Sequence, residues 1–99
     1  MSTVLPMRSQ SARNKQNRQV AHTLKLLGET IHALIHDGYT VLRYEMSEWG
    51  APLIEIQNCT QCERLLGCWY KRIHDNEGSR YVFQKMINGC RVEWSTRGH

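Results

Sequence analysis

The spacing of apolar residues changes at Asp37-Gly38, and this change constrains the fold more than any other feature of the chain. Before it, apolar residues recur every three or four positions, as on one face of a helix, at Val20, Leu24, Leu27, Ile31, Leu34 and Ile35. After it the period is two, as in strands that bury one face. Glycine at position 38 suits the end of a helix. The sequence therefore predicts an amphipathic helix from about Ser11 to His36, followed by a sheet.

Four segments after Gly38 have the pattern of strands, and a fifth follows a hairpin turn. They are residues 39–46, 53–58, 68–74 and 80–87, and the segment from Cys90 onward. Asn88-Gly89 is the pair preferred by a two-residue type I′ turn, which would place Ile87 opposite Cys90 and Phe83 opposite Trp94. Residues 59–67 are expected to form an irregular or briefly helical connector. The expected fold class is α+β, with the helix packed on an antiparallel sheet of about five strands.

The net charge of +4 comes entirely from the first nineteen residues. Arg8, Arg13, Lys15 and Arg18 lie there without an acid, and from Val20 onward nine basic residues balance nine acidic ones. We therefore expect a basic arm (1–19) and a single α+β domain (20–99). Residues 1–10 lack periodicity and are expected to be disordered, while the rest of the arm either projects as a charged helix or is disordered until bound. Such an arm favours contact with an anionic partner through its four basic side chains.

Four cysteines are the candidates for a metal or redox site. Cys59 and Cys62 form a CxxC pair, and Cys68 and Cys90 could complete a tetrahedral zinc site. A second interpretation is thiol redox chemistry, because the residues after Cys62 could form a helical turn that lowers a thiol pKa. A third is that the cysteines are buried as small apolar residues. We expect no cofactor, with zinc as the alternative.

Aromatic residues are the candidates for partner contacts. One helix covers only one face of a sheet, so aromatic side chains on the other face could stack on bases or anchor a protein interface. Trp49, in a turn beside Gly50, and Trp69 and Tyr70 are the expected partner-binding residues. The sequence contains no Ser-His-Asp set, phosphate loop or paired acid motif, and we expect a binding protein rather than an enzyme.

A short chain with a basic arm, a Trp- and Cys-containing body and no catalytic motif resembles the small accessory proteins encoded in phage and prophage early regions. That resemblance implies binding that redirects host nuclease, recombination, transcription or restriction machinery. We therefore expect a non-enzymatic regulator of a host protein or protein–nucleic-acid complex. No apolar run reaches the length of a membrane span, so a cytoplasmic location is expected, with neither a membrane nor a small-molecule substrate as partner. A direct nucleic-acid-binding protein and a CxxC zinc or thiol-redox protein are the alternatives.

Overall fold

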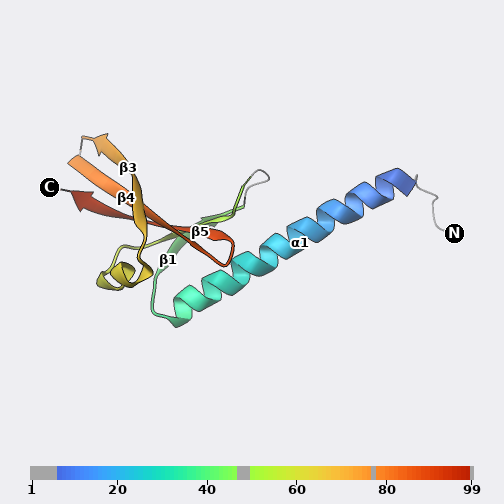
Figure 1. Ribbon diagram of the computed structural model, residues 1–99, viewed down its shortest axis with the longest axis horizontal. Coiled ribbons are helices and arrows are strands. Elements are labelled where there is room, and N and C mark those ends of the chain that lie inside the picture. Colours follow the sequence, from blue (N-terminus) through green and yellow to red (C-terminus); the bar gives the residue numbers. More distant parts are fainter. Residues whose placement is uncertain (1–6, 47–49, 77, 99) are drawn as a thin grey trace.

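A long helix followed by a twisted sheet makes up the protein (Figure 1). The computed structural model describes residues 7–46, 50–76 and 78–98; the side chains of residues 7–13, 69, 70, 75, 97 and 98 lie outside this description. The elements are α1 (Met7–His36), β1 (Val41–Glu45), β2 (Leu53–Ile56), the 3₁₀ helix η1 (Thr60–Leu65), β3 (Cys68–Asp75), β4 (Gly78–Ile87) and β5 (Cys90–Gly98). The predicted α+β fold, a helix followed by five strands, is confirmed.

α1 begins at Met7, earlier than the sequence predicted. The expectation of disorder over residues 1–10 is wrong for residues 7–10, which are helical. Once a helix exists, each further residue that is fixed adds one hydrogen bond, whereas the first turn fixes three residues for one bond. Pro6 precedes this point in the sequence, and proline is tolerated only at or before the first turn of a helix. The expected boundary between arm and domain, after Gln19, falls inside α1.

The end of α1 is a Schellman motif built on Gly38. The Tyr39 N–H donates to the Leu34 carbonyl at 2.9 Å, and the Gly38 N–H donates to the Ile35 carbonyl at 3.0 Å. Gly38 has a φ of +95°, which favours glycine. The predicted helix end is therefore confirmed, and the turn directs the chain into the sheet.

The strand order is β1-β2-β5-β4-β3, and the sheet is mixed. β1 with β2, β3 with β4, and β4 with β5 are antiparallel, whereas β2 and β5 run parallel. The antiparallel pairs are joined by short connections, whose turns favour this arrangement. β2 and β5 are separated by η1, β3 and β4, so no turn dictates their direction. The sheet is mostly antiparallel, as expected, with one parallel pair that the sequence pattern did not indicate.

The hairpin between β4 and β5 has the predicted register. Asn88 and Gly89 both have positive φ, as a type I′ turn requires, and Ile87 lies opposite Cys90. Thr30 of α1 fixes the helix to this turn: its hydroxyl lies 3.3 Å from Asn88 Nδ2 and 3.5 Å from Cys90 Sγ.

The helix and sheet share one core, made of Leu27, Leu34, Tyr39, Ile54, Ile56, Cys62, Cys90, Val92 and Trp94.

β1 contains an irregularity that reverses the phase of its side chains. Val41 lies opposite Ile56 and packs against the core, but Arg43 lies opposite Glu55, so the register shifts by one residue at Leu42. A bulge of this kind inserts an extra residue into one strand. Simple alternation from Thr40 to Met46 would place Val41 and Arg43 on the same face, and the bulge places them on opposite faces.

Candidate functional site

The N-terminal part of α1 extends beyond the sheet (Figure 1). Burial along the apolar stripe of α1 shows where the helix stops packing on the sheet. Leu27 is 2% exposed, whereas Leu24 is 51% and Val20 43% exposed. From Met7 to Leu24 a helix is about 27 Å long, at about 1.5 Å per residue. We call this segment, residues 7–24, the projecting helix. It agrees with one of the two states expected for the arm, the charged helix.

The projecting helix has two different faces. Lys15, Arg18 and His22 are spaced by three and four residues, so they share a face, and all three are exposed. Val20 and Leu24 continue the apolar stripe that packs under the sheet. Arg18 and Val20 are two residues apart, which is about 200° around a helix, so the basic and apolar faces are opposed.

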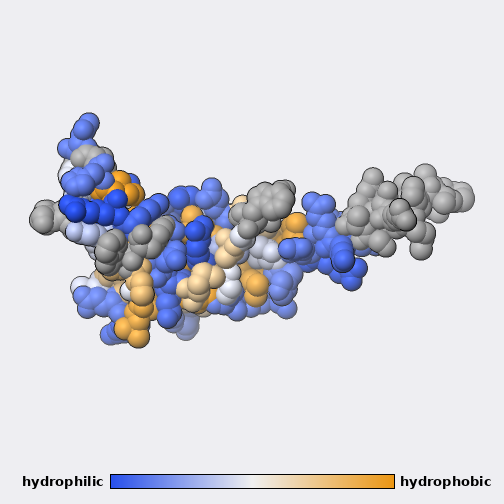
Figure 2. Space-filling model, turned by 45° about the horizontal axis from the view of Figure 1, so that its top comes forward, coloured by the Kyte–Doolittle hydropathy of each residue, from blue (hydrophilic) through white to orange (hydrophobic). Residues whose placement is uncertain are grey.

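The charged residues of the projecting helix are all basic. The sequence has no acid before Glu29, and the first turn of α1 contains none. The helix dipole adds partial positive charge at this end. Arg8 and Arg13 belong to the same helix, although their side chains lie outside the described part. The described surface of this segment is mostly hydrophilic (Figure 2).

The aromatic candidates fall largely outside the described residues. Trp49 is one of these, and Trp69 and Tyr70 lie in β3, at an edge of the sheet, without described side chains. Trp94, in contrast, is buried and stacks on Phe83 with ring centroids 5.9 Å apart. Its role is in the core.

The structure brings two of the four cysteines together. Cys59 and Cys62 lie at the start of η1 with their sulfur atoms 3.6 Å apart. Cys90 is buried under β5 beside Thr30, and Cys68 is exposed on β3. Among the described residues, no group of three or more histidine, cysteine or acidic side chains is placed to hold a metal ion. The four-cysteine zinc site suggested by the spacing is therefore not assembled, because Cys68 begins β3 and Cys90 begins β5, apart from the CxxC pair.

Cys62 is a buried thiol with a raised pKa. Burial raises the pKa of the Cys62 thiol to about 11. The pair lines a recess of about 520 Å³ together with Phe83 and Trp94. Cys62 itself is 2% exposed and belongs to the core.

Exposed apolar residues on β1 and directly after it are the feature that the sequence did not single out. Leu42, Tyr44 and Met46 are 56%, 62% and 39% exposed, although Ile54, which lies opposite Tyr44 on β2, is buried. The sequence signal was an apolar strand pattern, which predicts burial on a sheet. β1 is an edge strand, and an edge position cannot be inferred from such a pattern.

Comparisons with known proteins identify no relative: no family model, curated protein or solved structure matches this chain. In the described part of the chain, no helix combines the length and apolar character needed to cross a bilayer.

Proposed function

We propose that this is a non-enzymatic accessory protein that binds a protein–nucleic-acid complex, with the basic face of the projecting helix on nucleic acid. The observation that carries the proposal is a helix that leaves the body with Lys15, Arg18 and His22 on one exposed face and no acid before Glu29. The width of the DNA major groove admits an α-helix. The resemblance to phage accessory proteins supports a host complex as the target, in the reducing cytoplasm where four thiols persist.

The composition of the helix favours phosphate over a lipid surface. Interfacial helices carry a broad apolar face with aromatic or leucine residues. The chain has no aromatic residue before Tyr39, and Val20 and Leu24 provide the exposed large apolar side chains on the described part of the projecting helix. Attraction to phosphate needs charge alone and therefore suits this segment better.

Salt dependence of nucleic-acid binding tests the proposal. We expect the full chain to bind a labelled 20-base-pair DNA duplex of mixed sequence in fluorescence anisotropy. With at most four basic residues in contact, the slope of log affinity against log salt should be clearly negative but no steeper than about −3.5, and near zero after removal of residues 1–19. A slope near zero for the full chain would contradict the proposal.

A matched pair of variants separates local charge from net charge. Lys15→Gln with Arg18→Gln should lower the magnitude of the slope by about 2, because each substitution leaves one phosphate without its basic side chain. Arg80→Gln with Lys85→Gln changes the charge equally on the body, where both residues are exposed. The second pair should leave the slope unchanged. Equal effects of the two pairs would assign binding to net charge and not to the helix.

A second candidate function, direct regulation of a protein, is favoured by the uncovered apolar face of the same helix. Val20 and Leu24 are exposed on the stripe that packs under the sheet farther along. A groove with an apolar floor and an acidic rim would match both faces. Capture of a partner from lysate that survives nuclease and high salt, and is lost in Val20→Ser with Leu24→Ser, would favour this function. Loss of capture on nuclease treatment would favour nucleic acid.

A further inference from the structure

β1 is an edge strand whose outer side lacks a strand partner in the described sheet. The strand order places β1 first, paired with β2 alone. Half of the backbone N–H and C=O groups of an edge strand point outward, where they can pair with another chain. Natural edge strands are often protected by short length, by bulges and by charged side chains, especially lysine. β1 is short and has the bulge at Leu42, but its charged residues do not share one sign.

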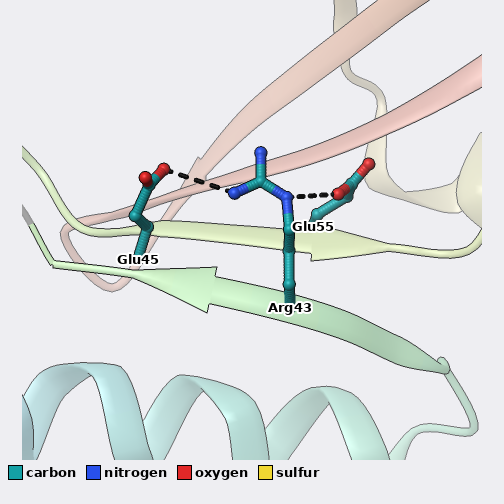
Figure 3. Close-up of polar contacts among 3 residues, drawn as sticks. All are labelled: Arg43, Glu45 and Glu55. Carbon is teal, nitrogen blue, oxygen red and sulfur yellow. Dashed lines mark hydrogen bonds and ion pairs between the residues drawn. The ribbon is translucent and has the colours of Figure 1, made fainter.

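The charges on β1 have opposite signs two residues apart. On the face directed away from α1, Arg43 Nε donates to Glu55 Oε1 at 2.6 Å and Arg43 Nη1 donates to Glu45 Oε2 at 3.3 Å (Figure 3). If a second β1 is placed antiparallel with Tyr44 opposite Tyr44, Arg43 of each copy lies opposite Glu45 of the other. Arginine has five N–H donors, so a bond to the second copy is compatible with the pair to Glu55.

The apolar residues of β1, with Met46 directly after it, match in the same register. Tyr44 lies opposite Ile54 and so shares the face of the sheet that packs on the core. Leu42 would lie opposite Met46 of the second copy. Leu42, Tyr44 and Met46 are all exposed in the single chain. Pairing would therefore cover apolar surface and match opposite charges at once, and both features contribute to cross-strand stability.

We infer that β1 is a self-complementary dimerisation strand, which pairs antiparallel with β1 of a second copy about a two-fold axis at Tyr44. The occupant of this edge is a second copy, because the segment is complementary to its own reverse. Antiparallel pairing places arginine opposite glutamate and apolar residues opposite apolar residues over Leu42-Arg43-Tyr44-Glu45-Met46. The inference does not depend on the proposed function, and its test uses the protein alone.

Sedimentation equilibrium of the full chain tests the dimer. We expect the mass to rise from one chain toward two between about 10 µM and about 1 mM, because a single strand pair buries less than a standard interface. Glu45→Arg leaves the Arg43–Glu55 pair intact but turns both charge pairs across the axis repulsive, so it should weaken the dimer about tenfold or more. Glu63→Arg, the same change at an exposed residue of η1, is the control and should have little effect.

Mixing two variants provides a test that misfolding cannot imitate. Arg43→Glu and Glu45→Arg should each be monomeric alone, because like charges face each other. In a mixture, arginine faces glutamate at both pairs, so a mixed dimer should form with affinity close to that of the original chain. Circular dichroism would check that each variant is folded.

Four results of these experiments would overturn the inference. A monomer at every concentration, or a dimer that Glu45→Arg leaves intact, would overturn the inference, as would equal weakening by Glu63→Arg. Mixing that fails to restore a dimer from folded variants would also overturn it. Rapid cross-linking of Tyr44→Cys but not of Met86→Cys, both in a Cys68→Ser background, would support the two-fold axis at residue 44.

Discussion

Replacing Leu27 or Leu24 by alanine tests where α1 leaves the body of the protein. The two residues have the same type and lie one turn apart on the same apolar stripe. Leu27 is fully buried against the core, whereas about half of Leu24 is exposed. Leu27→Ala loses the transfer free energy of the removed groups and leaves a cavity, at a cost of about 2.7–5 kcal/mol. For Leu24→Ala we expect less than about 1 kcal/mol, because solvent fills the space and alanine is the better helix former.

Urea unfolding followed by far-ultraviolet circular dichroism measures both values. Leu27→Ala should lower the transition midpoint without a change in the slope of free energy against urea. For a domain of 60–100 residues, a loss of about 3 kcal/mol corresponds to a melting temperature lower by about 12–24 °C. Equal effects of the two substitutions, or a loss below about 1 kcal/mol for Leu27→Ala, would refute the assigned boundary of the projecting helix.

Two further predictions concern the core near η1. Gly67→Ala should destabilise the fold by about 1–3 kcal/mol in the same urea assay, because a Cβ there would overlap Cη2 of Trp94 and lie 2.8 Å from its Cζ2; an unchanged midpoint would contradict this packing. The pKa of Cys62 is raised by burial from 9.0 to about 11, so the folded state keeps its proton where the unfolded chain loses it. Stability should therefore fall as pH rises from about 9 to 11, and Cys62→Ala should show a smaller fall across that range.

The local features of the fold were predictable because short segments specify them. Gly38 marks the end of α1, and Asn88-Gly89 sets the register of β4 and β5, since each needs a positive φ that few residues adopt. The parallel pairing of β2 with β5 depends on how separate hairpins dock. The bulge at Leu42 depends on packing of β1 on β2. Neither has a signal within a few neighbouring residues.

The candidate site was predictable only in part for the same reason. The net charge of the arm is a sum over residues. The sequence alone therefore identified Lys15 and Arg18 as candidate contacts. The exposure of Tyr44 follows from the position of β1 at the sheet edge, which is a property of topology. The separation of Cys68 and Cys90 from the CxxC pair likewise depends on the paths of β3 and β5. Spacing alone could not distinguish these arrangements.

The stability of the projecting helix links its structure to its proposed role. Packing on the sheet stabilises α1 from Leu27 onward, whereas the preceding turns have little tertiary support. Most helical stability in proteins comes from such packing, and isolated helices of this length are marginal in water. Like charges one turn apart, as at Lys15 and Arg18, weaken the helix further. A bound phosphate chain would remove that repulsion, so binding of an anionic partner and formation of the helix would stabilise each other.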